Sequence, residues 1–190
     1  LVHGDDFVGV GDEDAILTLV KMLSAAFELK VRAQLGPDRT DAKEVRVLNR
    51  MIRYVNDERG ERVEYEADPR HAELIVDQLG LQRAKSVTSP GVKLKVEEAI
   101  AISPDLTADL VKLYRSVTMR GQYMSADRSD LQYVTKERAR FMKKPTERDL
   151  AALKRIGRYL LKRPRLVQLF WRQNEPKKIV TFTDADHAGC

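Results

Sequence analysis

The sequence has little of three things: cysteine, aromatic side chains and long apolar runs. Cys190 is the only cysteine, so no disulfide can form within the chain, and a reducing compartment is expected. No apolar stretch approaches the roughly 20 residues that cross a bilayer. The chain also has no initiator methionine and no basic signal region at its start. We therefore expect a piece of a longer intracellular protein that is neither secreted nor membrane-spanning.

Charge is unevenly distributed along the 190 residues. Of these, 43% are hydrophobic and 33% charged, an ordinary composition for a chain that buries a core. The net charge is +5, but residues 136–178 hold fifteen Lys or Arg against four acids. That segment has an excess of +11, so the remainder is acidic by about six charges. A basic segment beside an acidic region is typical of a metal-dependent enzyme that acts on nucleic acid. A solvated surface of basic helices is the alternative.

Two adjacent carboxylates, Asp5 and Asp6, lie between short apolar runs and close to glycines. This pattern predicts a β-hairpin with the acids at or beside its turn. Neighbouring carboxylates repel each other, and their common chemical use is to hold divalent ions such as Mg²⁺. Two such ions can clamp the attacking and leaving oxygens of a phosphoryl transfer. An acidic surface turn is the alternative, because turns favour aspartate.

Residues 1–66 predict an α+β layer. After the hairpin, apolar spacing indicates a helix over 12–27 and then a half-buried strand over 29–35. Further strands are expected in 45–55 and 62–66, and a glycine-containing turn joins these two into a second hairpin.

The rest of the chain predicts mostly helices. Helices are expected over 69–79, from Ser103-Pro104, from Ser129, and from Thr146 to Pro164. A loop is expected over 84–95. Two short strands, 166–171 and 179–183, should form a terminal hairpin that places Asp184 at a strand end. An Asx turn that ends the strand is the other reading of Asp184.

Four blocks of the sequence stand out in order along the chain: Val2–Phe7, Leu113–Leu131 (with Tyr114, Arg115, Gly121, Tyr123, Arg128 and Asp130), Ala151–Leu160, and Thr183–Gly189. Together they resemble the reverse transcriptase of copia-type LTR retrotransposons over nearly the whole chain. The first block is similar to the family's Tyr-Val-Asp-Asp catalytic turn, and the last block to the opening of its RNase H domain.

This resemblance implies a domain plan. Residues 1–66 would be the C-terminal half of a polymerase palm, and 67–163 a helical thumb and connection. Residues 164–190 would be a connection hairpin and the first strand of RNase H. The expected fold is therefore α+β: a partial palm, then a mostly helical region, then a terminal β-hairpin.

The resemblance also implies roles for particular residues. Asp5 and Asp6 would be two of three palm carboxylates, and Asp184 the first RNase H carboxylate; each would ligate Mg²⁺ or Mn²⁺, with two ions per complete site. One ion would lower the pKa of the primer 3′-hydroxyl and the other would steady the leaving pyrophosphate. No catalytic role follows for Asp186.

Four basic residues of the predicted helix 146–163 are expected to contact nucleic acid: Lys154, Arg155, Arg158 and Lys162. The implied partners are an RNA template, a DNA primer, the RNA–DNA hybrid, dNTPs in the intact enzyme, and other parts of the same polyprotein. The implied location is a cytoplasmic particle, the nucleus, or both.

The sequence departs from the family's pattern at His3, Gly4, Ser129 and His187. The first palm carboxylate would lie upstream of Leu1 and the remaining RNase H acids beyond Cys190. The intact parent would be an RNA-directed DNA polymerase, whereas this fragment alone is not expected to be active. One alternative is a non-catalytic remnant that binds nucleic acid. Another is the palm of an RNA-dependent RNA polymerase, which Gly4-Asp5-Asp6 would fit, but the Thr183–Gly189 block argues against it.

Overall fold

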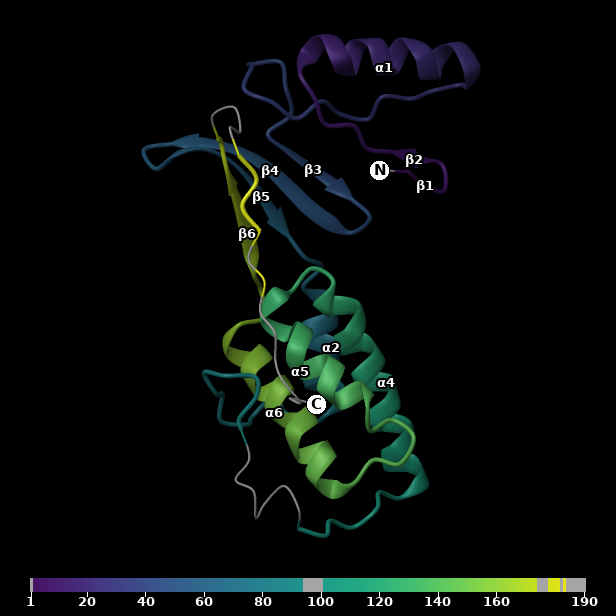
Figure 1. Ribbon diagram of the computed structural model, residues 1–190, viewed down its shortest axis with the longest axis vertical. Helices are drawn as coiled ribbons and strands as arrows, with labels where there is room; N and C mark the ends of the chain where they lie inside the picture. Colours follow the sequence, from purple (N-terminus) through teal and green to yellow (C-terminus); the bar gives the residue numbers. More distant parts are fainter. Residues whose placement is uncertain (1, 94–100, 174–177, 182, 184–190) are drawn as a thin grey trace. The chain divides into compact units, whose positions relative to one another are not determined.

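The computed structural model describes residues 2–93, 101–173, 178–181 and 183. The chain divides into two compact units, Leu1–Ala42 and Lys43–Cys190. Helices and antiparallel strands are mixed, as Figure 1 shows, so the predicted α+β class is confirmed. The palm and thumb assignments, and the boundaries predicted at residues 66 and 163, remain predictions. Among the helices of the described residues, none is long and apolar enough to span a bilayer.

The first unit contains the predicted hairpin and helix. Strands β1 (Val2–His3) and β2 (Asp6–Phe7) pair antiparallel, with His3 opposite Asp6. Gly4 has φ +56°, a conformation that glycine adopts without strain at the first turn position. Helix α1 (Glu13–Ala26) begins where the Asp12 carboxylate accepts a hydrogen bond from the Ala15 amide at 2.9 Å.

The strand predicted over 29–35 is wrong. Residues 28–34 have no strand partner, and Leu35 makes only an isolated bridge to Ala42. Val31, expected on the inner face, is 57% exposed. Alternation of apolar and polar residues shows which side chains could share a face, but a strand also needs a neighbour for its amides and carbonyls.

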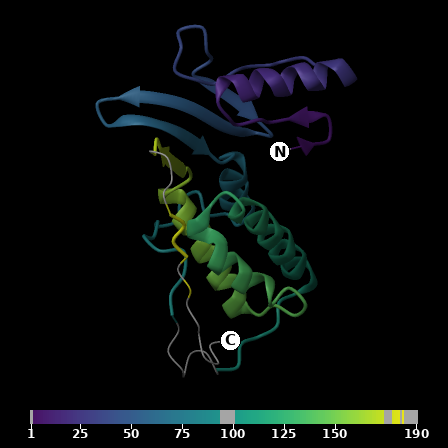
Figure 2. The same ribbon diagram turned by 45° about the horizontal axis from the view of Figure 1, so that its top comes forward.

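The second unit contains a four-stranded antiparallel sheet in the order β3-β4-β5-β6. Its strands are β3 (Glu44–Val47), β4 (Arg50–Asp57), β5 (Gly60–Glu66) and β6 (Val167–Trp171). Leu48 and Asn49 join β3 to β4 with φ of 47° and 65°, the sign pattern of a type I′ turn. Figure 2 shows β4 and β5 as the long hairpin of this sheet, which confirms the hairpin predicted there.

The predicted terminal hairpin is not formed in the described residues. Strand β6 pairs instead with β5, from Glu66 opposite Val167 to Arg62 opposite Trp171. Residues 178–181 and 183 have no strand structure, and residues 174–177 and 182 lie outside the described part. The edge of β5 that does not face β4 offers its backbone hydrogen-bonding groups to β6. Local sequence patterns cannot reveal this pairing, because helices separate β5 from β6 along the chain.

Four helices of the second unit share one apolar core. They are α2 (Arg70–Gln78), α4 (Ala108–Ser125), α5 (Ser129–Ala139) and α6 (Glu147–Lys162). Ile75, Leu131 and Ile156 are at most 2% exposed at its centre. Two predicted helices are confirmed with their ends: α2 stops before Gly80 at φ +65°, and α6 begins with a capping box between Thr146 and Asp149.

Two predicted helix starts need correction. Helix α4 begins at Ala108, because the Ser103 hydroxyl accepts a hydrogen bond from the Arg148 amide at 3.1 Å and so serves the first turn of α6. Ser129 is the first helical residue of α5 rather than its cap, which is Arg128. Phe141 lies beyond the end of α5 and is 40% exposed.

Candidate functional site

The Asp5-Asp6 pair lies at the tip of the β1–β2 hairpin, as predicted. Asp5 occupies the turn and is exposed, whereas Asp6 begins β2. Asp6 pairs with Arg32, whose guanidinium lies 3.6 Å from Asp6 Oδ1; the side chains of Arg32 and Asp6 are 78% and 44% exposed. An ion pair this exposed is worth little, so the two carboxylates are accessible to a ligand.

The donor chemistry of the hairpin fits part of a divalent-metal site. Asp5 and Asp6 supply carboxylate oxygens, which Mg²⁺ and Mn²⁺ prefer. Within the described ranges, no group of three or more His, Cys, Asp or Glu is placed to hold a metal ion. The hairpin therefore offers two protein ligands of such a set, and the metal remains a prediction.

Asp184 and the rest of the Thr183–Gly189 block, except Thr183 itself, fall outside the described residues. The predicted RNase H carboxylate and its metal therefore stay predictions.

The four predicted nucleic-acid-binding residues of α6 divide into two kinds. Lys154 and Lys162 are exposed. Arg158 is partly buried, and its Nε donates to the Lys85 carbonyl at 2.6 Å, while the Val87 amide donates to the Arg158 carbonyl at 3.3 Å. Arg158 thus fastens the loop after α2 to the bundle. Arg155 is also partly buried, with a buried Nε that has no partner among the described residues.

Two of the sequence blocks meet in the bundle core. The Arg128 side chain is 1% exposed and donates to both carboxylate oxygens of Asp130, at 2.9 and 2.8 Å. It also donates to the Arg163 carbonyl at 3.0 Å and the Pro164 carbonyl at 3.2 Å, beyond the end of α6. Tyr159 of the next block donates to Asp130 at 2.8 Å. These motif residues hold α5, α6 and the start of β6 together.

Electrostatics explain why Asp130 stays charged in this position. Burial favours its neutral form, but hydrogen bonds from Arg128 and Tyr159 outweigh burial and lower the pKa of Asp130 below its usual value. Burial, together with the hydrogen bond to Asp130, raises the pKa of Tyr159. The group is a satisfied ionic network with a structural role.

A second ionic centre joins the sheet to the α4–α5 turn. The Asp127 carboxylate accepts from Arg50 Nε at 3.0 Å and from the Tyr65 hydroxyl at 2.7 Å, while its backbone carbonyl accepts from Gln168 at 2.6 Å. Burial and the hydrogen bond to Asp127 raise the pKa of Tyr65 to about 12. Strands β4, β5 and β6 are therefore all fixed to one aspartate of the helical region.

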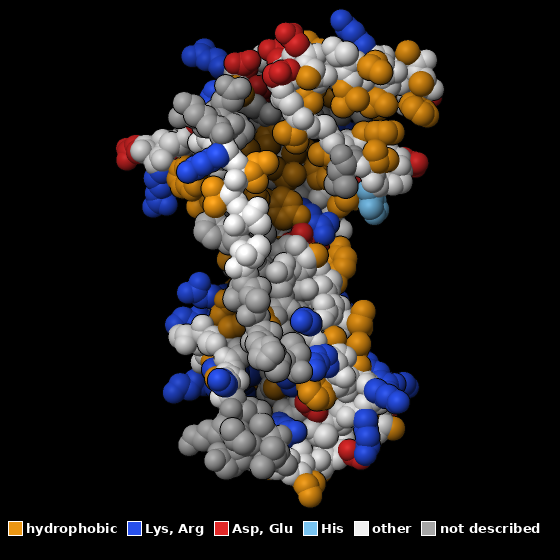
Figure 3. All heavy atoms as spheres, viewed as in Figure 1, with side chains coloured by type: hydrophobic (Ala, Val, Ile, Leu, Met, Phe, Trp, Pro, Cys, Tyr) orange, Lys and Arg blue, Asp and Glu red, His pale blue; other side chains and the backbone are white. Residues whose placement is uncertain are grey.

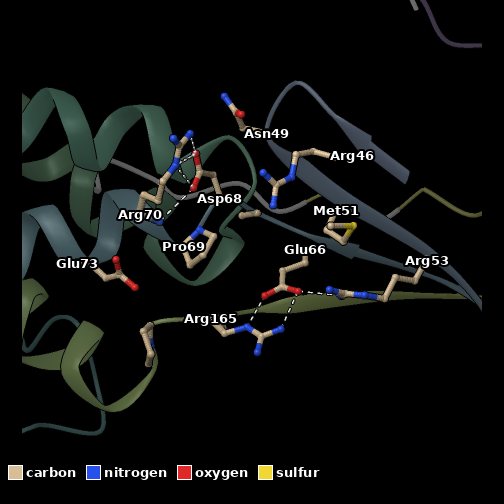
Figure 4. A pocket seen from close by; sticks show the side chains of 12 residues that line it. Arg46, Asn49, Met51, Arg53, Glu66, Asp68, Pro69, Arg70, Glu73 and Arg165 are labelled. Carbon is tan, nitrogen blue, oxygen red and sulfur yellow. Dashed lines mark hydrogen bonds and ion pairs between the residues drawn. The ribbon is translucent and has the colours of Figure 1, made fainter. Parts of the chain in front are cut away.

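An arginine-rich pocket of about 400 Å³ was missed in the sequence. It is bounded by the β3–β4 hairpin, by the end of β5 with the start of α2, and by the segment before β6 (Figure 4). Its four arginines are Arg46, Arg53, Arg70 and Arg165. Arg46, Arg53 and Arg70 lie within 25 residues of one another, but Arg165 joins them only through the β5–β6 pairing. No local pattern could therefore have indicated the whole set.

Glu66 and Asp68 organise this pocket. Glu66 accepts from Arg53 NH1 at 2.8 Å and from Arg165, whose NH2 lies at 2.8 Å. Hydrogen bonding from Arg165, against the opposing effect of burial, keeps the pKa of Glu66 below its usual value. Asp68 binds Arg70 through both of its carboxylate oxygens. Three of the guanidiniums are therefore held in place by two carboxylates.

Comparison with known proteins gives one partial relative. No family model matches the chain, and no solved structure matches it. Over 76 residues, 40% of this chain, it is 37% identical to the "Retrovirus-related Pol polyprotein from transposon RE1" of Arabidopsis thaliana. The match spans about 5% of the length of that polyprotein. This similarity supports an origin in a retrotransposon Pol polyprotein.

Proposed function

We propose that the chain is part of a retrotransposon RNA-directed DNA polymerase of the copia type that runs into the start of an RNase H domain. Its reaction in the intact parent would be metal-dependent nucleotidyl transfer to a primer 3′-hydroxyl. The observation that carries this proposal is the Asp5-Asp6 pair at a hairpin tip, where Asp5 is exposed and the side chain of Asp6 is 44% exposed. The partial similarity to a Pol polyprotein supports it independently.

In this proposal the residues of the chain have separate tasks. Asp5 and Asp6 would bind Mg²⁺ or Mn²⁺, together with a further carboxylate from the parent protein. When bound, such ions would supply activation of the primer hydroxyl and charge neutralisation at the leaving pyrophosphate. Lys154 and Lys162 would contact phosphates of the hybrid, since both are exposed on α6.

Metal binding by the hairpin can be measured on this chain directly. Paramagnetic Mn²⁺ should broaden the NMR signals of residues 3–8 selectively, and Asp5→Asn with Asp6→Asn should remove that broadening. Asp14→Asn is the matched control, because Asp14 is an exposed acid in the first turn of α1. Broadening that survives in the double variant would remove the hairpin from the metal site.

Activity needs the longer parent protein. There, Asp5→Asn should abolish Mg²⁺-dependent primer extension, while Asp14→Asn should leave it intact. Primer extension that persists in Asp5→Asn would overturn the catalytic assignment.

A second candidate function is a non-catalytic module that binds nucleic acid. The exposed Lys154 and Lys162 favour it, because phosphate contacts require no complete active site. Each Lys→Ala change should reduce the salt dependence of hybrid affinity by about one counterion. A non-catalytic module would be favoured over a polymerase if the chain binds the RNA–DNA hybrid but Mn²⁺ does not broaden the signals of the hairpin.

A further inference from the structure

The arginine pocket contains one guanidinium that nothing in the described chain neutralises. Arg46 extends from β3 and is exposed, and its side chain makes no hydrogen bond or ion pair with another described residue. Figure 4 shows Arg46 and Asn49 extending from the β3–β4 hairpin on the opposite side of the pocket from the one remaining acid, Glu73. The hairpin side of the pocket therefore offers the Arg46 guanidinium and the Asn49 amide as donors that no carboxylate of the described residues engages.

The other three arginines of the pocket are held by carboxylates, and some of their N–H groups remain without a partner among the described residues. Asp68 accepts from Nε and Nη2 of Arg70, and Nη1 of Arg70 makes no hydrogen bond to another described residue. Glu66 forms ion pairs with both Arg53 and Arg165, so one carboxylate is shared by two guanidinium groups. Counting the lining side chains, four guanidiniums face three carboxylates, which leaves one positive charge in excess. Donors that are already oriented lose little entropy when an anion binds.

From this arrangement we infer that the pocket binds a phosphate group, with Arg46, Asn49 and Arg70 as its contacts. A guanidinium presents planar paired N–H donors that match phosphate oxygens. The Asn49 amide adds a neutral donor, and Asn49 adopts its φ of 65° with little strain. A pocket volume of about 400 Å³ accepts a phosphate together with the group that carries it.

Two sources of phosphate share this chemistry: a nucleic-acid backbone and a free phosphate ion. A backbone source rests on the proposed function, and a free ion does not. The pocket lies in the Lys43–Cys190 unit, and its proposed contacts come from the β3–β4 hairpin and the start of α2, whereas Lys154 and Lys162 belong to α6. The pocket is therefore proposed as a contact point formed by different residues.

The test uses the full chain, with inorganic phosphate and a short RNA–DNA hybrid as probes. Arginine side-chain NMR signals are followed during phosphate titration, and the hybrid is then added in competition. Arg46→Gln should weaken phosphate binding about tenfold, the value of one charge-assisted contact. Asn49→Gly, which tolerates the positive φ, should weaken it less. Arg59→Gln is the matched control: an exposed arginine of the same sheet, in the β4–β5 turn and outside the pocket.

Each outcome has a defined meaning. Weakening by Arg46→Gln with displacement by the hybrid supports a backbone phosphate, and weakening without displacement supports a free phosphate. Equal weakening by Arg46→Gln and Arg59→Gln would show only diffuse positive charge and would overturn the inference, as would an absence of phosphate binding. Mn²⁺ binding at Asp5 and Asp6 is read from different signals, so failure here leaves the proposed function standing, and the converse also holds.

Discussion

The two units of the chain differ in how much they bury. In the helices of the Lys43–Cys190 unit, Ile75, Leu131 and Leu160 are at most 1% exposed. In the Leu1–Ala42 unit no residue of α1 is buried, and Leu17, Met22 and Phe27 are 47%, 67% and 58% exposed. Figure 3 shows apolar side chains on the surface of α1 and cationic side chains over the helical bundle. The proposed metal ligands thus lie in the unit whose side chains are less buried, whereas the apolar core lies in the helical bundle of the Lys43–Cys190 unit.

The largest expected effect belongs to the buried arginine of the bundle. Arg128→Ala should lower the free energy of unfolding by about 4 kcal/mol, because it leaves Asp130 charged and partly buried without its partner. Urea denaturation followed by circular dichroism measures this loss. Arg32→Ala, which breaks the exposed pair with Asp6, is the control and should cost less than about 1 kcal/mol. Similar losses from both variants would mean that burial does not distinguish the two units.

A pair of apolar truncations gives the next effect. Ile156→Ala should cost about 3 kcal/mol, because the side chain is 2% exposed and its removal leaves a cavity. Leu17→Ala in α1 should cost less than about 1 kcal/mol, because that side chain is already 47% exposed. Both are read from denaturation midpoints. If Leu17→Ala is as costly as Ile156→Ala, the apolar face of α1 is covered in solution.

The smallest effect is a pH dependence of the bundle. Burial, together with Arg120 and Arg70, lowers the pKa of His71, and Asp68 opposes them. The ring packs 4.7 Å from Tyr123 and its Nδ1 lies 3.2 Å from Arg120 NH1, so the neutral form is favoured in the folded state. Because the folded pKa is the lower one, this stabilisation is complete above about pH 6.5 and is lost as pH falls below it.

Replacing His71 tests this contribution. His71→Gln should flatten the loss of stability between about pH 6.5 and pH 5, above the range where carboxylates titrate. His3→Gln, at the exposed position opposite Asp6, should leave that loss unchanged. A stability profile that is the same in His71→Gln and the unchanged chain would contradict the assignment.

Local signals in the sequence predicted most elements correctly. The apolar spacing of α2 and α6, and the turns around Gly4 and Gly60, concern residues within a few positions of one another. Three predictions failed where the presence or absence of a tertiary partner decides the structure. The Ser103 hydroxyl serves α6, β6 pairs with β5, and residues 29–35 lack a partner strand.

The candidate sites also divide into residues that are close in sequence and residues that only tertiary packing brings together. Asp5 and Asp6 are adjacent in sequence, so their hairpin could be predicted. The burial of Arg158 against the Lys85 carbonyl and the meeting of Arg46 with Arg165 depend on tertiary packing, which single-sequence patterns do not contain. Sequence reasoning therefore identified charged residues on α6 but not which of them remain free.

The pairing of β5 with β6 has a consequence for how the chain folds. Glu66 and Val167 become neighbours only after all the intervening helices have been synthesised. Contacts within the helical bundle close shorter loops, so the bundle is expected to form first and the fourth strand to join last. Until then the hydrogen-bonding edge of β5 stays open on the nascent chain, and a ribosome that stalls before residue 167 would leave a three-stranded sheet able to pair with another molecule.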